Sequence, residues 1–280
     1  MTGLIKEEFF TTIKKKRFII LTAILFICAV VKAFMTKNDY LNDLTYLSAV
    51  QDYIWSFFSP FMGLILIFSL YRRQYTRSSI LQVQDRGLKR SSGVIARAVA
   101  GSLILICCYA LMALFLMLLG VIFGAHLTAQ QNGIIFLMVA TDCLAAIASL
   151  MGALFVLYLC PLLSIPALLV YSILMYFGPD ILIDVPGSSF HKIGCIFLPK
   201  LAMDSFCTGL IMSYIKWAYV LTLVLQIAVP LLLTLLVFKL KKLKEPKEKK
   251  PRKKKGDAEP DAGSSDDDEA AAVIAATTVI

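Results

Sequence analysis

The chain has 280 residues, of which 59% are hydrophobic and only 17% are charged. A soluble core of this length does not need so much apolar surface, and the mean hydropathy is +0.77, so the composition predicts a polytopic membrane protein. The net charge of +9 would favour nucleic-acid binding in a soluble protein. Here the basic residues cluster at the ends of hydrophobic runs, where they set the orientation of membrane helices, and this argues against DNA or RNA as a partner.

Apolar runs of spanning length recur along the sequence. The hydrocarbon core of a bilayer is about 30 Å thick and requires roughly 20 apolar helical residues. The runs that meet this requirement predict six transmembrane helices, at residues 18–35, 53–70, 98–123, 134–159, 162–178 and 210–238. We therefore expect an all-α membrane protein whose six-helix transmembrane domain covers residues 18–238.

Lys and Arg residues gather on one side of this predicted bundle. They lie at 14–17 before the first span, at 72–97 after the second, and at 239–242 after the sixth, whereas the opposite side receives mainly Asp. Because positively charged loops stay in the cytoplasm, the pattern predicts a multi-pass protein of the cell membrane with both termini cytoplasmic.

The residues before the first span form the pattern of an amphipathic helix. In LIKEEFFTTIKKKR, Leu4 or Ile5, Phe9 and Ile13 are spaced four apart on one helical face. Residues 1–17 are therefore predicted to lie in the membrane interface. The alternative is a frayed basic terminus that only fixes orientation.

A second amphipathic segment lies between the fifth and sixth spans. Phe190, Ile193, Phe197 and Leu201 recur at helical spacing among Gly and Pro residues. The segment is too polar to span and too apolar to leave the membrane, so we expect one or two short elements in the outer leaflet. Its two cysteines, Cys195 and Cys207, could form a disulfide or remain as two thiols.

The last predicted segment, residues 239–280, is a charged tail. A basic block, KLKKLKEPKEKKPRKKK, is followed by an acidic one with Gly, Pro and Ser and almost no aromatic residues. Such a composition cannot bury a core, and it predicts a disordered cytoplasmic tail.

The sequence lacks the motifs of a membrane enzyme. It has no metal-binding His/Glu spacing, no nucleophile with a matching base, and no GxxxxGK[ST] loop, so this chain is not expected to hydrolyse ATP alone or to bind a metal or cofactor. Asp142 is the notable polar residue, because it falls inside the predicted fourth span. It either belongs to a translocation path or bonds to Thr141 or to a facing helix.

The loop after the second predicted span carries a family resemblance. In ABC-2 type permeases, the membrane subunits of ATP-driven exporters, this loop typically has an acidic-aromatic start, Gly-Thr, an apolar pair, then Gly, a hydrophobic residue and Ser-Arg, with a Lys opening the third span. The matching positions here are Gln74 and Tyr75, Ser78 and Ser79, Ile80 and Leu81, then Arg86, Gly87, Leu88 and Arg90, and Arg97 for the Lys. The order of predicted elements over residues 1–242 also resembles this family, whereas Gln74 and Ser78 depart from its pattern and the tail has no place in it.

The resemblance implies a coupling helix between spans two and three that binds an ATP-binding cassette ATPase subunit. The implied contact residues are Tyr75, Ser79, Ile80, Leu81, Val83, Arg86, Gly87 and Arg90. It further implies a second permease copy, in a homodimer or a heterodimer, surrounding membrane lipid, and ATP and Mg on the ATPase partner rather than on this chain. Two alternatives remain open: a secondary transporter driven by an ion gradient through Asp142, and a scaffold or immunity protein without transport.

Overall fold

The computed structural model describes residues 1–35, 53, 58–71, 87, 89–122, 128–159, 164–182, 189–211 and 216–240. Every secondary-structure element among them is a helix, which confirms the all-α prediction. The helices are α1 (Thr2–Ile13), α2 (Lys16–Met35), α4 (Ser59–Tyr71), α6 (Arg90–Ile122), α7 (Ala129–Leu159), α8 (Ser164–Leu182), α9 (Ser189–Phe197), α10 (Pro199–Ile211) and α11 (Ala218–Leu240).

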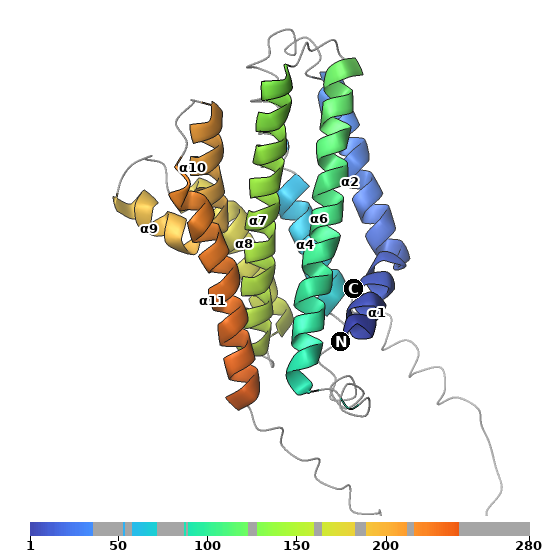
Figure 1. The fold of residues 1–280 in the computed structure, drawn as a ribbon, viewed down its shortest axis with the longest axis vertical. Coiled ribbons are helices and arrows are strands. Elements are labelled where there is room, and N and C mark those ends of the chain that lie inside the picture. The colour runs from blue at the N-terminus through green and yellow to red at the C-terminus, as the bar shows by residue number, and fades with distance from the viewer. Residues whose placement is uncertain are drawn as a thin grey trace, which may run out of the picture. The chain divides into compact units, whose positions relative to one another are not determined.

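Helix α7 is the centre of the bundle. It contacts α4, α6, α8, α10 and α11, and Figure 1 shows α6 and α11 running along it. In the most apolar stretch of α7, 72% of the residues are buried, whereas in the most apolar stretch of α11 only 11% are buried. Helix α7 is therefore surrounded by protein, and α11 is peripheral. Most side chains in this stretch of α7 therefore lie inside the protein rather than against lipid.

The structure confirms the prediction of a multi-pass membrane protein, but it does not confirm the predicted number of six spans. Among the described residues, three helices are long and apolar enough to cross a bilayer: Ser91–Ile122, Ala129–Leu159 and Ala218–Val237. The α9–α10 pair, bent by 116°, would make a fourth if it counts as one broken span.

The three remaining predicted spans contain α2, α4 and α8, which are not among these candidates. Helix α4 has 13 residues, about 20 Å at the α-helical rise, which is less than the bilayer core. Helix α8 has 19 residues, with Pro179 among them, and it includes the apolar stretch Pro166–Met175. Helix α2 has 20 residues, with Lys16, Arg17 and Lys32 among them.

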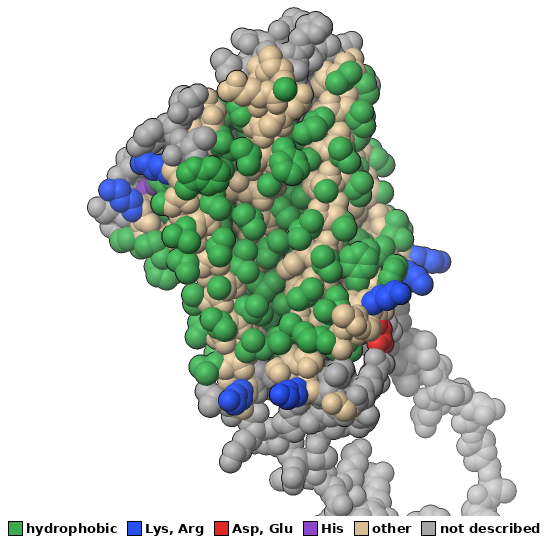
Figure 2. Space-filling view, in the orientation of Figure 1, with side chains coloured by type: hydrophobic (Ala, Val, Ile, Leu, Met, Phe, Trp, Pro, Cys, Tyr) green, Lys and Arg blue, Asp and Glu red, His purple; other side chains and the backbone are tan. Residues whose placement is uncertain are grey.

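Exposed apolar side chains cover the outside of the bundle. Figure 2 shows hydrophobic side chains spread over one face, with Lys and Arg at its edges. The large exposed side chains include Leu114, Leu118, Val121, Leu221, Leu225 and Leu232. In water such a surface would drive aggregation, whereas in a bilayer it faces acyl chains of similar polarity.

Helix ends differ from the predicted ones where polar residues extend a helix. Helix α7 begins at Ala129 instead of Ile134, because a capping box precedes it. The Thr128 Oγ1 accepts a 3.3 Å bond from the Gln131 amide, and the Gln131 Oε1 accepts a 2.7 Å bond from the Thr128 amide. A search for apolar runs does not detect such polar first turns.

The last span prediction needs two further corrections. Leu210, predicted to open the sixth span, belongs instead to α10, and α11 begins only at Ala218. Lys239 and Leu240, predicted to open the tail, are the last residues of α11. The rest of the predicted tail lies outside the described residues.

The predicted apolar face of the N-terminal helix packs against protein. Leu4 of α1 is buried in contact with Ala96 of α6, and Phe9 and Ile13 pack against the main core of the bundle. Helix α1 therefore buries this face on α6, which places the N-terminal segment beside the start of α6 (Figure 1).

Candidate functional site

Asp142 lies on the buried side of α7 and is only 3% exposed. Its Oδ2 accepts a short hydrogen bond from the Ser59 hydroxyl at the start of α4. The Tyr109 hydroxyl of α6 donates in turn to the Ser59 Oγ at 2.8 Å. A hydrogen-bonded chain therefore runs from α6 through α4 to α7. The acid bonds to a facing helix and not to Thr141, whose hydroxyl donates to the Leu137 carbonyl at 2.7 Å.

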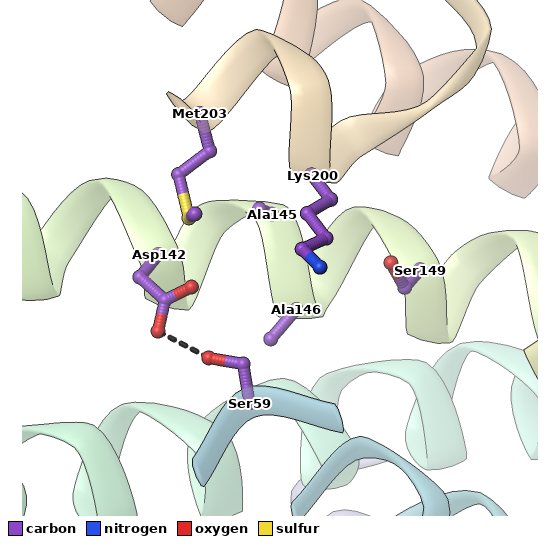
Figure 3. Close-up of a pocket in the computed structure, with 7 residues that line it drawn as sticks. All are labelled: Ser59, Asp142, Ala145, Ala146, Ser149, Lys200 and Met203. Atoms are coloured by element: carbon purple, nitrogen blue, oxygen red, sulfur yellow. Dashed lines mark hydrogen bonds between the residues drawn. The ribbon is translucent and has the colours of Figure 1, made fainter. Parts of the chain in front are cut away.

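A stripe of small side chains on α7 opens space beside Asp142. Ala145, Ala146 and Ser149 follow the acid at three, four and seven positions, which places all four residues on one helical face. The resulting cavity has room for about one water molecule. Its lining comes from α4, α7 and α10: Ser59, Asp142, Ala145, Ala146, Ser149, Lys200 and Met203 (Figure 3).

Lys200 brings the opposite charge into this cavity. It is the second residue of α10, directly after Pro199, whose ring suits the first position of a helix. The Lys200 side chain is 7% exposed and points toward α7 beside Asp142 (Figure 3). The two side chains therefore line the same cavity.

Sequence reasoning singled out Asp142 but missed Ser59, Tyr109 and Lys200. Lys200 falls in the segment that the sequence predicts to lie in the outer leaflet. The signal that could have found it is a single Lys after a proline and among apolar residues, in LPKLAM. Helical periodicity would then have placed it on the same buried face as Met203.

A second buried polar cluster lies where α1 meets the bundle. The Arg97 side chain is 7% exposed, and its Nε lies 3.4 Å from the Glu8 Oε1. Its Nη1 donates to the Tyr158 hydroxyl at 3.4 Å. Nearby, the Lys15 ammonium donates to the Ser69 carbonyl in the last turn of α4. Residues predicted only to set orientation therefore also tie α1 and α2 to α4, α6 and α7.

The α9–α10 hairpin has its own contacts. The His191 Nε2 lies 3.0 Å from the Ser205 Oγ. Cys195 and Cys207 are both buried free thiols in the described structure, which decides between the two alternatives that the sequence left open. In the part of the chain that the structure describes, no cluster of His, Cys, Asp or Glu could hold a metal ion.

The predicted coupling helix is described only at its end. Gly87 is exposed and has a φ of +71°, a backbone conformation that favours glycine, and Arg90 is the first residue of α6. The other predicted contact residues lie outside the described residues: Tyr75, Ser79, Ile80, Leu81, Val83 and Arg86. The structure thus places the two ends of this loop at the last turn of α4 and the first turn of α6.

Comparisons of the chain with family models, with curated proteins and with solved structures found no match.

Proposed function

We propose that this chain is the membrane permease subunit of an ATP-driven exporter of the ABC-2 type. The observation that supports this most is the order of its elements. An N-terminal helix packs on the start of α6, apolar helices follow, and the bent α9–α10 pair precedes the last apolar helix, α11. This is the order on which the resemblance of the sequence to the family rests.

In this proposal α2, α4, α6, α7, α8 and α11 are the six spans, and both termini are cytoplasmic. The shorter helices α4 and α8 pack against neighbouring helices, so they need not match the bilayer thickness alone. Two permease copies would face each other across the translocation path. Two ATPase subunits would supply ATP and Mg.

The partner contact is the loop between α4 and α6. Its segment SSILQVQ alternates small, apolar and polar residues, and an ATPase groove could hold such a short helix through Ile80, Leu81 and Val83. Tyr75, Ser79, Arg86, Gly87 and Arg90 would complete the contact, with the arginines also at lipid headgroups.

Motion of this loop would be transmitted to the helix bundle through the two ends of the loop. Lys15 holds the last turn of α4, and Glu8 holds Arg97 near the start of α6. When the ATPase subunits close around nucleotide, they would push the loop and tilt α2, α4 and α6 against the remaining helices. The path would then open alternately to the two sides of the membrane.

Purification of the tagged chain from its native membrane in mild detergent tests the proposal. A protein with a GxxxxGK[ST] loop should be enriched over an unrelated tagged membrane protein of similar hydropathy, as measured by mass spectrometry. Failure of any such ATPase to associate would contradict the proposal.

One observation favours a second candidate, a transporter driven by an ion gradient. Asp142 is a buried acid with hydroxyl neighbours beside a cavity the size of a water molecule, as in a proton or ion relay. Proteoliposomes that contain the chain alone distinguish the candidates. The second predicts a flux of protons, sodium or potassium that Asp142→Asn abolishes, whereas the first predicts no such flux without an ATPase.

A further inference from the structure

The turn between α1 and α2 carries a dense cluster of positive charge. Helix α1 ends at Ile13 and α2 begins at Lys16, so the chain reverses within a few residues. The four consecutive basic residues at this turn are Lys14, Lys15, Lys16 and Arg17. No acidic residue occurs between Glu8 and Asp39 in the sequence. Because like charges repel, the cluster favours a negatively charged partner from outside this segment.

Three of the four basic side chains are accessible to such a partner. The Lys15 ammonium is directed into the bundle, where it donates to a backbone carbonyl in the last turn of α4. Lys14, Lys16 and Arg17 are exposed, and they form no ion pair in the part of the chain that the structure describes. The Lys14 ammonium lies 6.0 Å from the centroid of the exposed Phe10 ring. We call these three exposed cations the basic elbow.

An exposed apolar stripe runs along α2 from the basic elbow. Its members recur three or four positions apart, and each is between 47% and 61% exposed: Ile20, Ile24, Ile27 and Val31. The opposite face of α2 is buried in the main core through Phe18, Leu25 and Ala29. Because Lys16 lies four positions before Ile20, the cations and the stripe share one side of the helix.

The stripe has the length of one lipid acyl chain. From Ile20 to Val31 it extends about 16 Å at the α-helical rise. One leaflet contributes half of a bilayer core of about 30 Å, which is about 15 Å. Figure 2 shows the same arrangement on a larger scale, with Lys and Arg side chains at the edges of a hydrophobic surface. Positive charge at one end of an apolar stripe of this length is complementary to a phospholipid with an anionic headgroup.

We propose that the basic elbow and the stripe bind one anionic phospholipid. Lys14, Lys16 and Arg17 hold its phosphate, whose oxygens accept charge-assisted hydrogen bonds from ammonium and guanidinium groups. One acyl chain of the same lipid lies along the stripe from Ile20 to Val31. This inference goes beyond the proposed function, since it requires only that α2 lies in a bilayer and does not require an ATPase partner.

Quenching of tryptophan fluorescence identifies the lipid at the stripe. Ile24→Trp places a fluorophore about 12 Å along α2 from Lys16, and Trp55→Phe with Trp217→Phe removes the two native tryptophans. The full chain is reconstituted into mixtures of dioleoylphosphatidylcholine and dioleoylphosphatidylglycerol, in which one or the other lipid carries brominated acyl chains. Bromine quenches tryptophan at short range, so the quenching gives the ratio of the association constants of the anionic and the zwitterionic lipid at this site.

The intact elbow should prefer the anionic lipid by about fivefold or more, the contribution of a single basic residue near an anionic surface. Lys16→Gln with Arg17→Gln should lower the ratio to within about twofold of one. Lys16→Arg with Arg17→Lys keeps both charges and should retain the preference. The control, Lys89→Gln with Lys239→Gln, removes two exposed lysines just before α6 and in the last turn of α11. This control should leave the ratio unchanged.

Several results would overturn the proposal. A ratio near one with the intact elbow, or an equal loss of preference in the control, would show that the elbow has no site of its own. If neither brominated lipid quenches the fluorescence, protein rather than lipid covers the stripe. If the chain with both glutamines does not accumulate, Lys14→Gln and Lys16→Gln decide as single variants. Each should lower the ratio by at least about twofold, and an unchanged ratio in both overturns the proposal.

Discussion

Arg97 of α6 and Glu8 of α1 form an ion pair, with 3.4 Å between the Nε and Oε1 atoms. Arg97 also bonds to Tyr158 in the last turn of α7, so one guanidinium joins three helices. The pair lies beside the first turns of α6, where the chain returns from the loop that we propose as the ATPase contact. Helix α1 is therefore placed to sense the position of that loop.

Loss of the Glu8–Arg97 pair should loosen α1. Arg97→Gln removes the Glu8–Arg97 ion pair and a donor to Tyr158, and we expect a loss of about 1–3 kcal/mol, reduced from the value for a fully buried pair because Glu8 is partly exposed. The melting temperature of the purified chain in detergent measures this loss. Lys6→Gln, at an exposed position on the same helix, is the control and should leave the melting temperature unchanged. Equal melting temperatures for Arg97→Gln and the control would show that the pair contributes no stability.

Close packing of α8 on α7 depends on Gly152. A Cβ atom at this position would lie 2.0 Å from the Tyr171 Oη, and Tyr171 donates to the Ser149 carbonyl at 3.1 Å. Gly152→Ala should therefore force the ring away and lower stability by about 1–3 kcal/mol. Gly133→Ala is the matched control, because a Cβ at that glycine of α7 meets no atom within 4 Å.

The two glycine variants are compared by thermal denaturation. Gly133→Ala should be neutral or stabilising by about 0.5–1 kcal/mol, since alanine is the better helix former. Adding Tyr171→Phe to Gly152→Ala removes the closest atom and should recover part of the lost stability. A Gly152→Ala variant as stable as Gly133→Ala would contradict the packing described for α7 and α8.

Substitutions in the loop between α4 and α6 test the proposed partner contact. Leu81→Asp would place a charge in an apolar groove, and Gly87→Trp would add bulk at a backbone with a φ of +71°. Both variants should insert normally into the membrane but uncouple ATP hydrolysis from export. Gln82→Ala, at a polar position of the same segment, is the control. Normal export in both variants would show that the contact lies elsewhere.

The helices could be predicted from sequence, but their partners could not. Apolar runs located a helix in each of the six predicted ranges, because long stretches of apolar residues have few other stable states. The observed helix ends differ from the predicted ones where polar residues extend a helix, as the capping box at Thr128 does. Asp142 could be singled out because an acid in an apolar run is costly. Lys200 could be noticed in LPKLAM, but its position beside α7 could not be predicted, because α10 packs on α7 after a 116° bend between α9 and α10.

We propose that this chain works as the membrane subunit of a complex with separate ATPase subunits. The mass and ATP hydrolysis of the complex purified from the native membrane test it most directly. We expect two permease chains with two P-loop ATPase subunits, and hydrolysis that Leu81→Asp changes without altering the amount of permease in the membrane. A chain that purifies alone, with no nucleotide-binding partner and no ATP hydrolysis, would contradict the proposed function.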